Sequence, residues 1–271
     1  MPSQPWARRD FLRRSMALGV AAVAAPAALS ACTSVNTGPG GTLENARSAG
    51  TIKIGIANEA PYGFTDPSGK VTGESVEVGR AVLKNLGIGD VQATVVDFGS
   101  LIAGLNAKQF DMVTAGMFIN PERCANAAFS DPDYTAPTAF LVPKGNPKGI
   151  TSFDDVVANN LRIAVLSGAV EQGYAEKSGV PAAQIQVVDT QNTLLQAVTA
   201  GRADAGGAHQ HLPQRRGREE PPARRSRSPP ASSPTIDGKE TISAGAFVFR
   251  KDDAPARGGV QRRAEEAARQ R

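Results

Sequence analysis

The pattern of apolar and polar positions divides the middle of the chain into alternating strands and helices. Residues 52–56 alternate isoleucine with lysine or glycine, which predicts a strand, and apolar residues at 78, 82 and 86 then recur at helical spacing. Residues 91–98 and 110–117 predict two more strands, with a helix between them that Ser100 can cap. This β-α-β-α-β order is typical of a parallel sheet covered by helices, with ligands bound at the carboxyl ends of its strands.

A second, smaller round of the same pattern follows. It predicts helices over 153–158, 170–177 and 193–200 and strands over 162–166 and 184–188. Apolar strands at 139–142 and 245–249 lie on either side of this round, so the chain is predicted to leave one lobe, build a second and return. We place lobe one at 51–138 and 240–271 and lobe two at 139–239, with the two crossings as hinge strands.

The N-terminus carries the features of an export signal. Arginines between positions 8 and 14 precede an apolar stretch over 16–29 that is too short for a permanent membrane anchor, which predicts a signal peptide over 1–32. The run 8–12 (RRDFL) resembles the twin-arginine pattern for export of a folded protein. An ordinary basic signal for export of the unfolded chain stays open.

A lipid anchor is predicted at Cys32. Residues 29–32 (LSAC) resemble the bacterial lipobox, in which the cysteine sulfur receives diacylglycerol. Such acyl chains hold an exported protein in the periplasm or at the outer face of the cytoplasmic membrane. The segment 33–50 is predicted to be a tether, rich in Ser, Thr, Gly and Pro up to Gly41, with folding expected to start near Thr42.

Composition narrows the chemistry. The formal net charge of +4 comes from arginines near the two ends, so it does not predict nucleic-acid binding by the folded part. The sequence contains no run of eighteen apolar residues, so no internal transmembrane helix is predicted. Cys124 is expected to be a small buried side chain. The histidines are His209 and His211, and no cluster has metal-ligand spacing, so neither a metal nor a cofactor is expected.

Several motifs resemble one protein family. They are Pro121-Glu122-Arg123, the run 129–134 (FSDPDY), the turn 201–205 (GRADA) and the run 246–253 (AFVFRKDD). Together they resemble the polar-amino-acid family of ABC-importer binding proteins. Residues 58–62 (NEAPY) and 73–75 (GES) resemble more narrowly its ectoine/hydroxyectoine branch, because ordinary amino-acid binders usually carry an aromatic residue at the position of Glu74.

The resemblance implies an α/β, two-lobed periplasmic-binding-protein fold (type II) with a cleft between the lobes. It implies a monomer, with no nucleic-acid partner, that delivers a small zwitterion, ectoine or 5-hydroxyectoine, to the permease of an ABC importer. A polar amino acid is the alternative solute. An enzyme like the periplasmic dehydratases on this fold is the alternative of another class, although no set of nucleophile, histidine and carboxylate is visible.

The resemblance also assigns ligand-binding residues in lobe one. Arg123 is the expected carboxylate clamp because its planar fork can hold both oxygens; a surface ion pair with a nearby acidic residue is the alternative. In ectoine binders aromatic side chains enclose the cationic ring, which assigns Tyr62, Phe98 and Phe118 to a cation–π cage, against ordinary core packing. Glu59 is expected to accept hydrogen bonds from the amidinium, against the alternative of an exposed loop carboxylate.

Lobe two is expected to complete the cleft. Ser167, Gly168 and Ala169 form a predicted turn before a helix, where free backbone N–H groups favour a carboxylate. In the wider family the position that matches Asp204 often binds an α-amino group. We therefore assign these four residues to the ligand site as well.

Between 206 and 234 the apolar periodicity vanishes, and continuation of a strand is not expected there. A disordered basic insert is one explanation. The other is a pair of compensated reading-frame slips over 206–234 and 254–271. Residues 201–225 and 252–271 can all be encoded by codons that begin with G or C, which is the pattern of third codon positions in a GC-rich gene. Read one base later, 206–220 can yield AALTSISLNDVVEKN, and 258–270 can yield AAFNAELKKLRDS, which has helical apolar spacing. If the slips are genuine, lobe two lacks its last strand.

Overall fold

The structure is a computed structural model that describes residues 41–209, 235–236, 239–240 and 243–269. The predicted signal peptide, the lipobox and the first part of the tether lie outside the described residues, as do residues 210–234 of the arginine-rich segment. The helices are α1 (Thr42–Ala49), α2 (Glu74–Asn85), α3 (Leu101–Asn106), α4 (Pro121–Asn126), α5 (Phe153–Ala158), α6 (Val170–Lys177), α7 (Gln191–Thr199) and α8 (Ala254–Arg269), with 3-10 turns η1 (Phe98–Ser100) and η2 (Ala182–Gln184). The strands are β1 (Thr51–Ile56), β2 (Phe64–Thr65), β3 (Val71–Thr72), β4 (Asp90–Val95), β5 (Met112–Phe118), β6 (Ala128–Phe129), β7 (Tyr134–Ala136), β8 (Thr138–Leu141), β9 (Ile163–Leu166), β10 (Ile185–Val188), β11 (Ala205–His209), β12 (Thr235–Ile236), β13 (Lys239–Glu240) and β14 (Ser243–Phe249).

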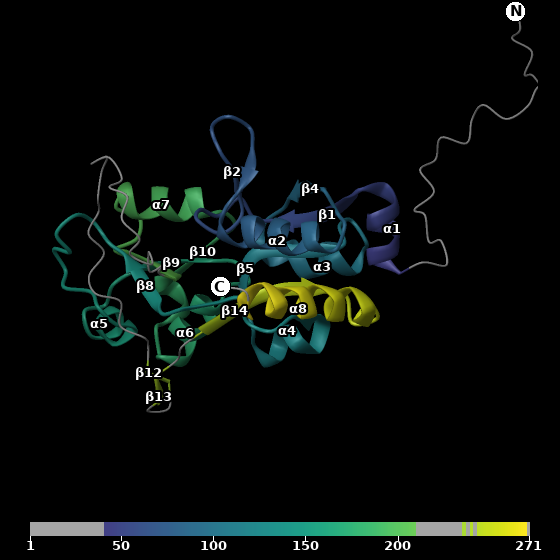
Figure 1. The fold of residues 1–271 in the computed structure, drawn as a ribbon. Helices are drawn as coiled ribbons and strands as arrows, with labels where there is room; N and C mark the ends of the chain where they lie inside the picture. Colours follow the sequence, from purple (N-terminus) through teal and green to yellow (C-terminus); the bar gives the residue numbers. More distant parts are fainter. Residues whose placement is uncertain (1–40, 210–234, 237–238, 241–242, 270–271) are drawn as a thin grey trace, which may run out of the picture. The chain divides into compact units, whose positions relative to one another are not determined.

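The first sheet forms lobe one (Figure 1). Its strands run in the order β4-β1-β5-β14-β6, and β7 also pairs with β14. β1 is parallel to β4 and β5, whereas β14 comes back from the far end of the sequence and runs antiparallel to β5. All seven residues of β5 are buried, as expected for a central strand with helices on both faces.

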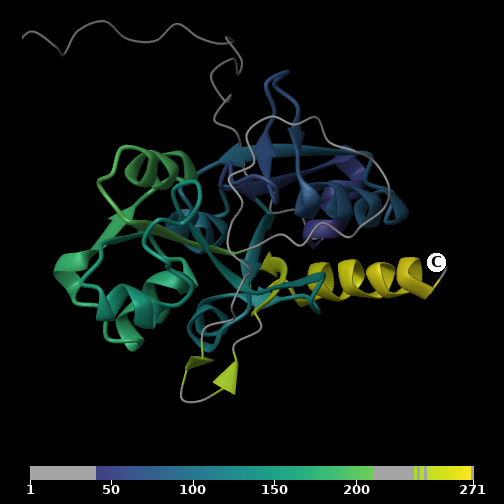
Figure 2. The ribbon, with the colours of Figure 1, turned by 90° about the vertical axis from the view of Figure 1, so that its left-hand side faces the viewer.

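Alternate residues of the central strands supply two apolar layers. Met112 and Phe247 pack in one cluster with side chains of α1, α2 and α8, whereas Val113 and Val248 pack in another with side chains of α3. In Figures 1 and 2 the yellow helix α8 lies along lobe one, where its buried residues include Val260. The C-terminal helix therefore helps to close the core that the first half of the chain begins.

The second sheet forms lobe two, with strand order β10-β9-β11-β8. β9 is parallel to both β10 and β11, and β8 is antiparallel to β11. Ile163 and Val165 face a core shared with α5 and α6, while Ala164 and Leu166 face a core shared with α7. The same alternation as in lobe one thus buries both faces of a short strand.

The chain crosses from the first sheet to the second between β7 and β8 and returns to the first in β14. One strand is shorter than predicted: the strand predicted over 91–98 ends at Val95, and Phe98 begins η1 instead. The carboxyl ends of β1, β5 and β9 are followed by the loops and helix starts that build the site described below.

Several sequence-based expectations need correction. Residues 42–49, which overlap the tether assigned over 33–50, form α1 from the expected start of folding at Thr42, and Leu43 and Ala46 belong to the core. No strand was expected from Gly206 onward, but β11 covers Ala205–His209. Residues 254–269 form α8, and the reading-frame hypothesis for this segment stays a prediction. Cys124 is exposed, because it lies on the outer side of the short helix α4.

Candidate functional site

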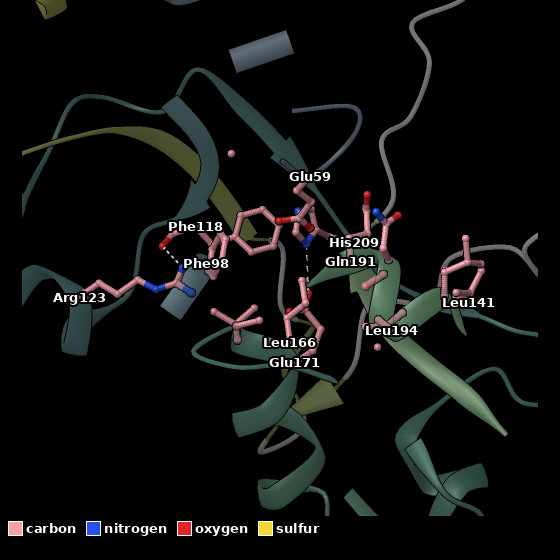
Figure 3. Close-up of a pocket in the computed structure, with 17 residues that line it drawn as sticks. Glu59, Phe98, Phe118, Arg123, Leu141, Leu166, Glu171, Gln191, Leu194 and His209 are labelled. Atoms are coloured by element: carbon pink, nitrogen blue, oxygen red, sulfur yellow. Dashed lines mark hydrogen bonds and ion pairs between the residues drawn. The ribbon is translucent and has the colours of Figure 1, made fainter. Parts of the chain in front are cut away.

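A cavity of about 240 Å³ lies between side chains of the two lobes (Figure 3). This volume lies below the usual 300–1,000 Å³ of drug-sized sites, so it suits a small solute. Its walls are largely apolar, with a few charged groups among them. The lining residues are Glu59, Phe98, Gly116, Phe118, Arg123, Leu141, Leu166, Ala169, Val170, Glu171, Gln191, Asn192, Leu194, Leu195, Gly207, Ala208 and His209.

Arg123 enters the cavity from the first turn of α4. The Asn120 side chain accepts a hydrogen bond from the Arg123 backbone N–H at 2.8 Å, and Pro121 begins the helix, so this residue is held at a capped helix start. Its guanidinium donates from Nη1 to the Phe118 carbonyl at 2.6 Å and from Nη2 to the Gly168 carbonyl at 2.8 Å. Burial lowers the pKa of Arg123, but a guanidinium stays charged in proteins.

The second bond of Arg123 joins the two lobes, because Gly168 follows β9 of lobe two. A guanidinium has five N–H donors, and these two bonds use two of them. The Arg123 guanidinium carbon also lies 5.3 Å from the centre of the Phe98 ring. The fork is therefore fixed in position while it keeps donors for an anionic group in the cavity. Among the ion pairs of the described residues, none joins the Arg123 side chain to Glu122 or Asp131.

Two buried carboxylates and one imidazole form the polar side of the cavity. His209 Nδ1 lies 3.4 Å from Glu171 Oε1, and His209 Nε2 lies 3.9 Å from Glu59 Oε1. The side chains of Glu59 and His209 are 7% exposed, and that of Glu171 is 2% exposed. Glu59 is thus a buried residue of the site, not an exposed loop carboxylate.

Burial and neighbouring charges shift the acidities of this group in different directions. Burial raises the pKa of Glu59, and the nearby His209 reduces that rise. Burial also acts to raise the pKa of Glu171, but the hydrogen bond with His209, the charge of His209, a backbone N–H and the charge of Arg123 together outweigh burial and hold this pKa below its usual range. For His209 burial acts to lower the pKa, and the Glu171 carboxylate outweighs it, so the pKa is raised. His209 and Glu171 are therefore an ion pair, while Glu59 holds a proton more readily than an ordinary carboxylate.

The three predicted aromatic residues gather near this polar group, but only two line the cavity. Phe98 and Phe118 do so, and Phe98 also belongs to the core packed against α3. Tyr62 is buried beside the cavity, with its ring centre 4.7 Å from that of His209. The Phe118 ring centre lies 4.6 Å from the same imidazole. The imidazole of His209 thus lies against both rings.

The predicted turn at 167–169 lies before α6, but its role differs from the expectation. The Ser167 N–H bonds to the Val188 carbonyl at 2.8 Å, and the Ala169 N–H bonds to the Leu166 carbonyl at 3.1 Å. These two N–H groups are therefore not free for a carboxylate. The turn contributes the Gly168 carbonyl, which holds Arg123, and Ala169, which lines the cavity; Ser167 is not among the lining residues.

Asp204 lies outside the cavity. Its carboxylate accepts from the Arg162 backbone N–H at 2.8 Å and pairs with Lys148 Nζ at 2.8 Å. It joins the start of β9 to the turn before β11 and so has a structural role in lobe two. The prediction that Asp204 contacts the ligand is not supported by this placement.

Among the lining residues that the sequence analysis did not predict are His209, Glu171 and Gln191. His209 was discounted because it lies in the arginine-rich segment, although the strand that carries it extends the GRADA turn. Glu171 lies two positions after the predicted turn, at the start of α6, and Gln191 follows Thr190, which caps α7. For the last two, the position at a helix start after a strand was the available signal.

Neither a group of metal-binding side chains nor a membrane-spanning helix is found among the described residues. Across 41–209 and the shorter described segments, no three His, Cys, Asp or Glu side chains are grouped so that they could hold a metal ion. In the same part of the chain, no helix has the length and apolar character required to cross a bilayer.

Comparison with known proteins identifies the family. The model of the bacterial extracellular solute-binding proteins, family 3, matches residues 52–261, so the chain belongs to this family. It is similar to a probable amino-acid ABC transporter periplasmic-binding protein of Sinorhizobium fredii, at 40% identity over 240 residues, which covers 88% of this chain and 78% of that protein.

Solved structures share the fold. The crystal structure of EhuB in complex with hydroxyectoine matches with a TM-score of 0.67 and 30% identity, covering 83% of this chain and 85% of that one. An ancestral amino acid-binding protein, a precursor of cyclohexadienyl dehydratase, matches with a TM-score of 0.69 and 26% identity, covering 85% and 94%. The α/β architecture is the type II periplasmic-binding-protein fold, as the resemblance implied.

Proposed function

We propose that this protein captures a small zwitterionic solute between its two lobes and delivers it to an ABC importer. One observation carries the proposal: a single cavity places the guanidinium of Arg123 and the carboxylates of Glu59 and Glu171 among apolar and aromatic walls. A zwitterion offers a carboxylate to the guanidinium and a cation to Glu59, while Glu171 is paired with His209. Each buried charge then has a partner, whereas an isolated buried charge is costly.

Ectoine and 5-hydroxyectoine are the solutes that we propose first. Their positive charge is spread over a flat amidinium ring, and such a cation gains about 0.5–2 kcal/mol from a well-placed aromatic face. Phe98 and Phe118 supply such faces at the cavity wall. The similarity to a protein crystallised with hydroxyectoine supports this assignment.

A polar amino acid is the second candidate. The relative from Sinorhizobium fredii is described as a probable amino-acid binding protein, and the ancestral structure is an amino acid-binding protein. In this case an α-amino group takes the place of the amidinium beside Glu59, and Arg123 holds the α-carboxylate. The family relationship favours binding without catalysis for either solute, and we propose that the protein acts as a monomer.

Isothermal titration calorimetry of the purified protein tests the proposal. The solutes are ectoine, 5-hydroxyectoine, glutamine and arginine, with glycine betaine as a zwitterion whose cation has no N–H to donate. We expect tight binding of one of the first four and weaker binding of glycine betaine. Tight binding of an amino acid without any binding of ectoines excludes the ectoine branch and keeps the importer role. Binding of none of them, with turnover of a candidate substrate, would favour an enzyme instead.

We also propose that diacylglycerol on Cys32 holds the protein at the outer face of the cytoplasmic membrane. The Cys32→Ala variant removes the sulfur that receives the lipid, so the protein should leave the membrane fraction or accumulate as an uncleaved precursor. Fractionation of cells and immunoblotting measure both outcomes. Normal processing with unchanged membrane attachment contradicts the lipobox, and Cys124→Ala is the control for loss of a thiol.

A further inference from the structure

Two buried polar atoms face the cavity without a hydrogen-bond partner among the described residues. They are Glu59 Oε2 from lobe one and His209 Nε2 from lobe two. The closest approach between the two side chains, 3.9 Å from His209 Nε2 to Glu59 Oε1, is too long for a direct hydrogen bond. Buried polar groups nearly always have partners, so a group of the bound solute is expected to supply one.

The position of His209 Nε2 is fixed by its surroundings. Nδ1 of the same ring lies 3.4 Å from Glu171 Oε1, and the ring lies against both Tyr62 and Phe118. Figure 3 shows the imidazole joined to Glu171 and turned toward Glu59. Since Glu171 occupies Nδ1, the other nitrogen is the one that remains for the solute.

The protonation of the pair decides which solute group fits. When one proton is shared between Glu59 and His209 Nε2, one of the two atoms is a donor and the other an acceptor, wherever the proton resides. A hydroxyl group both donates and accepts, so it can satisfy the two atoms together. An ammonium group only donates, and a carboxylate only accepts, so each of them leaves one atom of the pair unsatisfied.

The distance also suits a single oxygen. An oxygen at about 2.8 Å from both His209 Nε2 and Glu59 Oε1, which lie 3.9 Å apart, makes an angle of roughly 90° between them, which a hydroxyl oxygen bound to the Glu59 carboxyl group can accommodate. A methylene group in the same place contacts both atoms without satisfying either. The cost of that mismatch is what separates a hydroxylated solute from its deoxy analogue.

We propose that Glu59 and His209 form a hydroxyl-selective subsite, so that the preferred solute is a small zwitterion with a hydroxyl group next to its cationic part. This inference rests on the proposed function, because it names a further group of the same solute. Arg123 holds the carboxylate, and the hydroxyl bridges Glu59 of lobe one to His209 of lobe two. Hydroxylated solutes therefore stabilise the contact between lobes in a way that their deoxy analogues do not.

Calorimetry with matched pairs of solutes tests the proposal. Ectoine against 5-hydroxyectoine and alanine against serine each differ by one hydroxyl group. In whichever pair shows binding, we expect the hydroxylated solute to have an affinity about tenfold to a hundredfold higher than its analogue. The analogue cannot make the buried hydrogen bond. Equal affinity within the pair that binds overturns the subsite, because an ordered water then serves the two atoms equally well, and it leaves the proposed function intact.

Two variants assign the preference to these residues. Glu59→Leu removes one partner, and His209→Phe keeps an aromatic ring against Tyr62 and Phe118 while removing the nitrogen atoms. Each variant should reduce the affinity ratio of the hydroxylated solute to its deoxy analogue to about threefold or less. Leu195→Ala, which shortens an apolar wall away from this pair, should weaken both members alike and keep their ratio.

Thermal unfolding separates loss of folding from loss of selectivity. His209→Phe leaves the buried Glu171 without its ion pair and is expected to be less stable, so Glu59→Leu carries the test if that variant fails to fold. A preference that persists in folded Glu59→Leu protein overturns the proposal. Failure of every solute in both pairs to bind overturns the proposed function and this inference together.

Discussion

Arg123 combines two roles in one side chain. It holds the Phe118 carbonyl of its own lobe and the Gly168 carbonyl of the other, and it lines the cavity. Because a planar fork makes these bonds at fixed angles, the group that meets the solute carboxylate is positioned before the solute arrives. An ammonium group on a flexible chain cannot reproduce this arrangement.

Substitution of Arg123 by lysine keeps the charge and removes the fork. Arg123→Lys should therefore weaken solute binding by about tenfold to a hundredfold, with little loss of thermal stability. Calorimetry and differential scanning calorimetry measure the two effects. Arg80→Lys is the control, because Arg80 pairs only with the exposed Glu77 of α2 among the described contacts. An affinity as tight as that of the wild type would exclude Arg123 as the carboxylate clamp.

Asp133 is a second residue whose surroundings predict a measurable effect. Burial, with a contribution from Glu74, raises its pKa from 3.8 to about 7, against the backbone N–H groups of Asp133 and Tyr134, which act to lower this pKa. The folded state thus binds this proton more tightly than the unfolded state. Its contribution to stability is complete below about pH 4 and is lost as the pH rises toward 7.

Replacement of the Asp133 carboxyl group by an amide should abolish the loss of stability that accompanies rising pH. Asp133→Asn should be more stable than the wild type at pH 8, by about 1–4 kcal/mol in the free energy of unfolding, and close to it at pH 4. Urea unfolding at the two pH values measures the difference. Asp90→Asn, at an exposed position, is the control, and a variant that is destabilised equally at both pH values contradicts the assignment.

At the scale of elements, the start of α7 joins the two lobes. Gln191 accepts from the Ala60 N–H at 3.1 Å and donates to the Ala60 carbonyl at 2.9 Å, so one amide makes two bonds with the loop after β1. Thr190 caps the helix through the Thr193 N–H and thereby fixes the position of Gln191. The bonds can form only when the lobes are closed on each other.

Loss of the two bonds between Gln191 and Ala60 should speed the dissociation of the solute. Gln191→Ala should raise the dissociation rate by about tenfold and change the association rate less, because the broken bonds belong to the closed state. Stopped-flow fluorescence measures both rates. Gln172→Ala is the matched control, since Gln172 bonds only to Glu176 of its own helix among the described hydrogen bonds. An equal fall in the association rate would place Gln191 in the encounter with the solute instead.

Apolar periodicity was sufficient to predict the elements whose faces carry large side chains. It predicted β1, β9 and α7 and the order of the two lobes, but it missed β11. That strand contains Gly206 and Gly207, and a Cβ at Gly206 would lie 2.5 Å from Leu194 Cδ2. Small residues are needed there because α7 packs close to the strand, and the same glycines remove the apolar signal.

The candidate site was predictable where a motif marked it. Arg123, Phe118, Phe98 and Ala169 line the cavity as expected, whereas Asp204 forms ion pairs elsewhere. His209 could not be found, because the composition after it indicated a break while its strand is paired with β8 up to that residue. Pairing in a sheet is a long-range interaction that local composition does not report.

At the scale of the whole molecule, the reading frame of the last third determines what the site contains. The hypothesis of two compensated slips predicts a tryptic peptide ADAAALTSISLNDVVEK after Arg202, whereas the printed sequence predicts EEPPAR over 219–224. The shifted frame puts threonine in place of His209 and so removes the ion pair with the buried Glu171, which must then meet the cation of the solute directly. Tandem mass spectrometry of the purified native chain distinguishes the two frames, and recovery of the shifted peptide would overturn the hydroxyl-selective subsite, because that chain lacks His209. Recovery of EEPPAR would establish the printed frame, and with it the imidazole on which the hydroxyl-selective subsite depends.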